Sequence, residues 1–112
     1  MSLDEYIKAL REKNTIESKS ILEVKAKPPH PGKILKEEFI KPLGITQSQL
    51  AKELNVNVVQ INQLINKKRG ITANLAIKLA KRFNTTPEFW MSLQMKWDLW
   101  KAYKEQSKKI KV

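Results

Sequence analysis

Apolar residues recur every three or four positions over most of the chain, which is the spacing of one face of an α-helix. Five stretches after residue 30 show this spacing, and each is bounded by proline, glycine, threonine or asparagine. The alternating pattern of a half-buried β-strand has only one short, isolated candidate, at residues 21–24. The pattern therefore predicts an all-α protein with five helices, preceded by a short helical extension.

Capping residues mark the first two of these helices. Pro31 suits the first turn of the first helix, because its missing N–H would be unpaired there anyway. Pro42 and Gly44 are expected to end that helix. Thr46 and Gln49 have the spacing of a capping box, so the second helix should start beside them.

Similar signals bound the remaining helices. Asn57 is expected to cap the third helix, which should end in the basic run 67–69 before Gly70. The fourth and fifth helices should begin at Thr72 and Thr86. The basic residues of the fourth helix, Lys78, Lys81 and Arg82, are interpreted as a solvated face, and contact with DNA stays open as the alternative.

The second and third helices are joined by only about three residues around Asn55 and Val56, which suits the steep crossing of a helix-turn-helix. Ala51 is small enough to let the two helices approach closely, and asparagine at position 55 tolerates the left-handed conformation. This arrangement leaves one face of the third helix free for a major groove.

That face combines amide and valine side chains. Amides offer a donor and an acceptor that match the edge of adenine, and valine can contact the methyl group of thymine. Taken singly, each residue could equally be a solvated surface position, but as a group they favour recognition. The predicted base-reading residues are Asn57, Val58, Val59, Asn62, Gln63 and Asn66.

The charge of the chain agrees with a nucleic-acid partner. Twenty-two Lys and Arg residues against eleven Asp and Glu give a net charge of +11, which favours an anionic partner such as duplex DNA. Donors near the recognition face are expected to hold phosphates and so to position the protein without reading sequence. These predicted phosphate contacts are Gln47, Lys67, Lys68 and Arg69.

The inventory of reactive residues argues against an enzyme. The chain has 112 residues, enough for one core, with no Cys and a single His, so a catalytic triad, a metal site or a bound cofactor is hard to assemble. A small basic ribonuclease would need a β-sheet and a cluster of catalytic side chains. No signal peptide or membrane span is evident, so we expect a cytoplasmic protein.

The fifth helix is apolar on two sides. One stripe can pack on the domain, and the other needs a second surface, most simply the same helix of a two-fold partner. The first stripe is Trp90, Leu93, Trp97 and Trp100, and the second is Met91, Met95, Leu99 and Ala102. The alternative, that all the Trp side chains belong to one monomer core, stays open. The residues assigned to the homodimer interface are Trp90, Met91, Met95 and Leu99.

The string Thr46-Gln47-Ser48-Gln49-Leu50-Ala51, followed by Asn55-Val56, resembles the helix-turn-helix of the Cro and lambda-repressor type. A wider frame resembles the HigA (VapI-type) antitoxin family over about residues 30–103. Its segments are His30-Pro31-Gly32, Pro42-Leu43-Gly44, Lys68-Arg69-Gly70-Ile71-Thr72 and Thr86-Pro87-Glu88-Phe89-Trp90.

The resemblance implies a five-helix, lambda-repressor-like fold and a dimeric antitoxin. Such a protein binds an operator in its own promoter and neutralises a HigB toxin, a RelE-like ribonuclease that cuts mRNA on the ribosome. The alternative is a phage-type or other repressor with no toxin partner.

We therefore expect an N-terminal helix and tether at residues 1–29, a DNA-binding and dimerisation domain at 30–103, and a basic tail at 104–112. Up to Glu23 the first segment carries five acidic and four basic side chains, so it could meet a basic toxin. It could equally pack across its own domain. The residues assigned to toxin binding are Leu3, Tyr6, Ile7 and Leu10.

Overall fold

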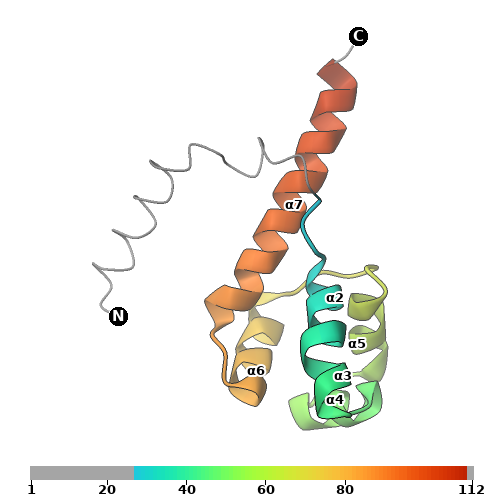
Figure 1. The fold of residues 1–112 in the computed structure, drawn as a ribbon, viewed down its shortest axis with the longest axis vertical. Helices are drawn as coiled ribbons and strands as arrows, with labels where there is room; N and C mark the ends of the chain where they lie inside the picture. Colours follow the sequence, from blue (N-terminus) through green and yellow to red (C-terminus); the bar gives the residue numbers. More distant parts are fainter. Residues whose placement is uncertain (1–26, 111–112) are drawn as a thin grey trace, which may run out of the picture. The chain divides into compact units, whose positions relative to one another are not determined.

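A computed structural model describes residues 27–110, and all the regular elements in this range are helical (Figure 1). The N-terminal segment, with its predicted toxin contacts, lies outside the described residues. The helices are α2 (Pro31–Ile34), η1 (Leu35–Ile40), α3 (Lys41–Leu43), α4 (Gln47–Leu54), α5 (Val58–Ile65), α6 (Ala73–Phe83) and α7 (Pro87–Ile110). The predicted all-α fold is confirmed.

The elements α2, η1 and α3 together form the first predicted helix. His30 caps it, because its Nδ1 accepts a hydrogen bond from the Gly32 N–H at 2.9 Å. The middle part, η1, is a π-helix, in which the Lys41 N–H donates to the carbonyl of Lys36, five residues back. Pro42 follows immediately; its ring crowds the carbonyl four residues earlier in an α-helix, and the wider π winding relieves this contact.

Four helical segments end in the same way, on a residue with a positive φ. These residues are Gly44 (φ 65°), Asn55 (φ 55°), Lys67 (φ 62°) and Asn84 (φ 55°). After each, the next N–H donates back to a carbonyl in the last turn, as Val56 does to Ala51 at 2.9 Å, which is the Schellman pattern. The left-handed conformation predicted for Asn55 is confirmed.

The end of α5 differs from the prediction. The helix stops at Ile65, not in the basic run, and Lys67 takes the left-handed position that glycine usually fills. Gly70 does not have a positive φ; it lies against Gln94, where a Cβ would come within 2.7 Å of the side chain. Gly70 therefore serves a close approach to α7 and not a helix end.

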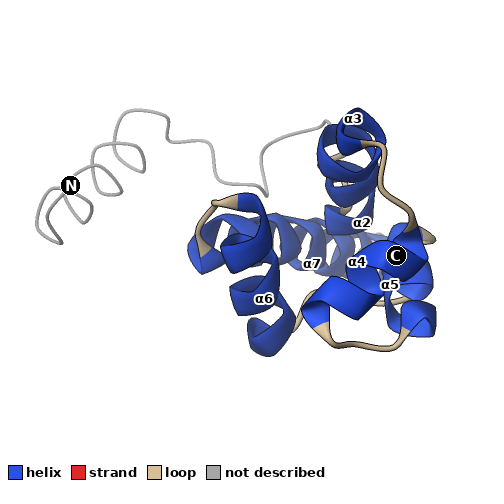
Figure 2. Cartoon of the chain, turned by 90° about the horizontal axis from the view of Figure 1, so that it is seen from below, coloured by secondary structure: helices blue, strands red, loops and turns tan. Residues whose placement is uncertain are grey.

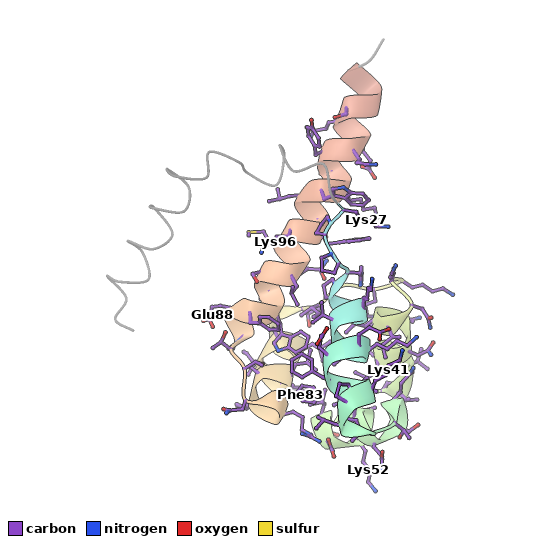
Figure 3. The ribbon with its side chains drawn as sticks, viewed as in Figure 1. Lys27, Lys41, Lys52, Phe83, Glu88 and Lys96 are labelled. Atoms are coloured by element: carbon purple, nitrogen blue, oxygen red, sulfur yellow. The ribbon has the colours of Figure 1, made fainter. Side chains whose placement is uncertain are left out.

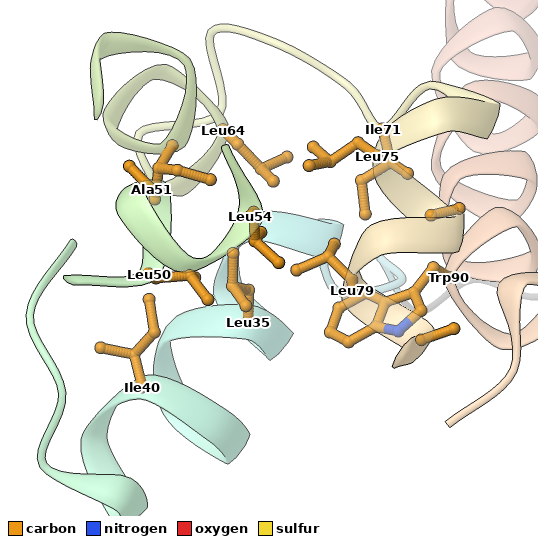
Figure 4. Close-up of a cluster of buried hydrophobic side chains, with 13 residues drawn as sticks. Leu35, Ile40, Leu50, Ala51, Leu54, Leu64, Ile71, Leu75, Leu79 and Trp90 are labelled. Carbon is orange, nitrogen blue, oxygen red and sulfur yellow. The ribbon is translucent and has the colours of Figure 1, made fainter. Parts of the chain in front are cut away.

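The core lies among α4, α5, α6 and the first helical segment (Figure 4). Leu35, Leu50, Leu64 and Leu79 are fully buried there. Trp90 joins them at 0% exposure, and its indole N–H donates to Thr85 Oγ1 at 2.8 Å. The predicted place of Trp90 in a dimer interface is therefore wrong, because its side chain has no surface left for a partner.

Gly32 sets the position of α5. A Cβ at this residue would lie 1.9 Å from the carbonyl oxygen of Leu64, so only glycine allows the first helix to touch the last turn of α5. Figure 1 shows α2 and α5 beside each other at this contact. The first helix thus packs against the last turn of α5 and helps to fix its position.

The chain forms two compact units, and residues 28–98 make up the one that holds the core. Lys27 and the part of α7 from Leu99 onward belong to the other, in which the Trp100 ring has Lys27 and Lys104 ammonium groups at 5.2 Å each. Helix α7 runs to Ile110, so the expected basic tail continues this helix as far as the structure describes it. No helix in residues 27–110 is both long and apolar enough to cross a bilayer.

Candidate nucleic-acid interface

The interface is built on the start of α4. Thr46 Oγ1 accepts from the Gln49 N–H at 3.0 Å, and Gln49 Oε1 accepts from the Thr46 N–H at 2.8 Å. The predicted capping box is therefore confirmed. It fixes the first turn of α4, in which Gln47 is the first residue.

Helices α4 and α5 pack directly on each other and are joined by the left-handed Asn55 (Figure 2). Ala51 is buried between them, as expected for a small residue at the crossing. Ile61 and Leu64 hold the inner side of α5 in the core. The opposite side of α5 is left exposed.

The structure brings the predicted base-reading residues together on this exposed side. Val58, Val59, Asn62 and Asn66 are exposed, and Gln63 is half-buried at its edge. Asn57 is exposed but already engaged, because its Oδ1 accepts from the Val59 N–H at 2.8 Å and caps the helix. One lone pair of this oxygen is therefore already used by the helix, while this bond leaves both N–H donors of the Asn57 amide available.

A chain of amides runs along this face. Asn66 Nδ2 donates to Asn62 Oδ1 at 3.2 Å, and Asn62 Nδ2 donates to Gln47 Oε1 at 3.1 Å. Each bond fixes which way the next amide points, so the donors and acceptors that remain for DNA are set in advance. Gln47, predicted only as a phosphate contact, also holds Asn62 in place.

The three predicted basic contacts lie exposed in the loop after α5. Arg69 Nε donates to Gln63 Oε1 at 3.1 Å, which ties the loop to the recognition face. Two basic groups outside this loop are paired with acids: Lys41 pairs with Glu37 at 3.1 Å, and Arg82 pairs with Glu53. Figure 3 shows Lys41 and Lys52 on the first helix and on α4.

Sequence reasoning missed a groove beside the start of α5. The groove is lined by Asn55, Val56, Asn57, Gln60, Thr72, Asn74, Leu75 and Lys78. Asn74 and Lys78 are four residues apart and so share one face of α6. This shared polar face was the only sign in the sequence that the two residues could act together. Their approach to the α4–α5 turn is a tertiary feature, and no spacing along the chain reports it.

The second stripe of α7 is exposed as predicted. Met91, Met95 and Leu99 present apolar surface, while Trp97 turns inward, its ring 4.8 Å from that of His30. Three of the four residues assigned to the dimer interface are thus accessible.

A helix-turn-helix family model matches residues 35–90, half of the chain. Antitoxin HigA-1 of Vibrio cholerae is 42% identical over 91 residues, covering 78% of this chain and 85% of that protein. The chain belongs to the HigA family of helix-turn-helix antitoxins.

Other members are similar in sequence and structure. An uncharacterized HTH-type transcriptional regulator of Haemophilus influenzae is 47% identical over 74 residues, covering 66% of this chain and 69% of that protein. The structure of the Pseudomonas aeruginosa antitoxin HigA with the higBA promoter matches with a TM-score of 0.71 at 39% identity, covering 75% of this chain and 91% of the other. These relatives are named as regulators and antitoxins, in agreement with the expectation that this HigA-family chain is not an enzyme.

Proposed function

We propose that this HigA-family protein binds an operator in its own promoter through the exposed face of α5. The observation that carries the proposal is the ordered chain from Asn66 through Asn62 to Gln47, flanked by valines. A preset row of amides beside apolar side chains suits A·T base pairs in a major groove. The structure of the Pseudomonas relative with the higBA promoter supports DNA binding by this family.

The double variant Asn62→Ala and Gln63→Ala tests the proposal. Each bidentate amide contact contributes about 1 to 3 kcal/mol of base discrimination, so the affinity for a selected duplex should fall by about 10-fold or more. Affinity for a random duplex should hardly change. Fluorescence anisotropy with both duplexes, the first obtained by in vitro selection from a random library, measures the ratio.

Lys68→Ala is the matched comparison. An exposed loop lysine on a phosphate should weaken binding to both duplexes by the same factor. If the double variant also lost both affinities equally, α5 would touch only the DNA backbone and base reading by these amides would be excluded.

We propose further that the protein acts as an antitoxin, neutralising a RelE/HigB-like mRNA-cleaving toxin through its N-terminal segment, which is slightly acidic up to Glu23. A ribonuclease toxin is basic and is repelled by the α5 face, so the contact should lie elsewhere. The proposed contacts are Leu3, Tyr6, Ile7 and Leu10. The name of the Vibrio relative supports this activity.

Deleting residues 1–27 tests the toxin contact. The compact unit of residues 28–98 is left whole, so operator affinity should be unchanged while rescue of growth from the toxin encoded beside this gene is lost. A full-length variant with the four apolar residues replaced by Ser should behave in the same way. Undiminished rescue by both variants would reject the N-terminal segment as the toxin contact. If no toxin is encoded beside the gene, the protein would be a repressor without a toxin partner.

A homodimer completes the proposal. Met91, Met95 and Leu99 lie at four-residue spacing along α7, and each is exposed. A two-fold partner packed on these side chains would present two α5 helices to successive turns of DNA, about 34 Å apart.

A further inference from the structure

We propose that the groove beside the start of α5 is a second phosphate site, which holds the DNA strand opposite the one contacted by Gln47. The inference rests on the proposed DNA binding and adds a site and a residue, Lys78, to it. From the sequence, DNA contact by the basic face of α6 was only an alternative, and the groove now gives Lys78 a specific place in it.

The lining of the groove suits an anion. Its polar side chains are the amides of Asn55, Asn57, Gln60 and Asn74, the hydroxyl of Thr72 and the ammonium group of Lys78. It contains one cation and no carboxylate. A phosphate oxygen placed there would meet N–H donors and a positive charge, and nothing in the lining would repel it.

Lys78 also differs from its neighbour one turn along α6. Arg82 is held by Glu53 of α4, so its charge is already matched. Lys78 is half-buried, yet no acid of residues 27–110 forms an ion pair with it. The charge of Lys78 therefore remains available for an outside anion at a place where solvent screens it less than on an open surface.

The groove and Gln47 lie on opposite flanks of α5. Residues two apart on a helix are about 160° apart around its axis, so Gln60, in the groove, and Asn62, bonded to Gln47, point to nearly opposite sides. The exposed Val59 and Asn66 lie on the arc between them. The base-facing front is thus bordered by one donor group on each side.

A major groove has the same layout. A helix inserted into it meets base edges in front and a phosphate backbone on each wall. With Gln47 toward one wall, the groove of Gln60 and Lys78 faces the other. The two sites together would fix the roll of α5 about its own axis, and hence which side chains reach the bases.

The test is the salt dependence of DNA binding by Lys78→Gln in the full chain. Affinities for the selected duplex and for a random duplex are measured over a series of salt concentrations. Because each phosphate contact contributes about 0.9 to the slope of log affinity against log salt, the slope should become shallower by about one for both duplexes. Lys81→Gln is the control, since Lys81 is exposed on the same helix and does not line the groove.

A second readout distinguishes DNA phosphate from a free anion. The side-chain amide signals of Gln60 and Asn74 in NMR spectra should shift with duplex DNA and stay in place with inorganic phosphate at the same phosphate concentration. Equal shifts with both would make the groove a general anion site and overturn the assignment to DNA.

The outcomes separate this inference from the proposed function. An unchanged slope for Lys78→Gln, or an equal change for Lys81→Gln, overturns the second phosphate site while the wild-type preference for the selected duplex still supports operator binding. If the wild-type protein shows no preference for any duplex, operator binding itself is rejected. Thermal unfolding followed by circular dichroism verifies that both variants are folded.

Discussion

At the scale of single residues, the interface depends on backbone conformations that few side chains tolerate. The left-handed Asn55 closes α4 and sets the entry to α5, and the left-handed Lys67 closes α5 itself. For an L-residue other than glycine or asparagine this conformation costs about 1 to 2 kcal/mol. Lysine at position 67 therefore lowers stability relative to glycine, and a role of its side chain in the proposed phosphate contact would account for this cost.

Replacing Lys67 with Gly should make the protein more stable and bind DNA less well. Relief of the left-handed strain outweighs the greater freedom of glycine in the unfolded chain, and we expect a gain of about 0.5 kcal/mol in the free energy of unfolding. Loss of the ammonium group should make the salt slope of DNA binding shallower by about one. Urea unfolding and anisotropy titrations measure the two effects.

Lys68→Gly is the control for this strain. Lys68 does not have a positive φ, so glycine brings only added freedom in the unfolded state and should lower stability. A loss of stability in both variants would show that Lys67 is not strained, and an unchanged slope for Lys67→Gly would remove it from the phosphate contacts.

At the scale of elements, short helices are held by their ends. Helices α4 and α5 have eight residues each, a length at which isolated helices do not persist in water. Both have a side-chain cap at the start and the Schellman pattern at the end. The caps satisfy N–H and C=O groups that tertiary packing alone would leave unpaired.

Thr46→Ala should lower the free energy of unfolding by about 1 kcal/mol, because the Gln49 N–H loses its acceptor. Loosening of the first turn should also weaken operator binding through Gln47. Thr46→Asp, which restores an acceptor, should recover most of the stability in urea unfolding. Ser48→Ala is the control, because Ser48 is exposed and lies two residues after the cap; this change should have almost no effect on stability.

At the scale of the whole molecule, α7 carries an exposed apolar stripe that is separate from the face of α5. The amide face lies on α5 and the basic loop follows that helix, while Met91, Met95 and Leu99 are exposed on α7. Met95 is 54% exposed in the single chain. A charge placed on it should therefore disrupt assembly and leave the fold intact.

Met95→Glu should convert the proposed dimer to a monomer in sedimentation experiments and weaken operator binding by well over 10-fold, since two half-sites could no longer be engaged together. Leu43→Glu is a closely matched control, because Leu43 is also 54% exposed but lies in the first helical segment. A dimeric Met95→Glu variant, or loss of the dimer in both, would place the interface elsewhere.

The difference between prediction and structure follows the range of the interactions involved. The capping box at Thr46, the left-handed Asn55 and the amide face of α5 were predicted because each depends on residues within a few positions of one another. The hydrogen bond between Gln47 and Asn62 and the groove with Lys78 were not predicted, and Trp90 was assigned to the interface with the core left as the alternative. Each of these features joins residues far apart in the chain.

The sequence alone determined the helices, their starts, the helix-turn-helix and the basic character of the chain. These features depend on local hydrogen bonding, on apolar periodicity and on charge, which neighbouring residues specify. Only the folded structure decided that Trp90 belongs to the core, that α5 ends at Ile65 with Lys67 as its left-handed cap, and that α6 lines the flank of the recognition helix. All the apolar surfaces of the chain compete for burial in one core. Which side of α7 is buried, and whether an acid pairs with Lys78, therefore depends on how the helices pack.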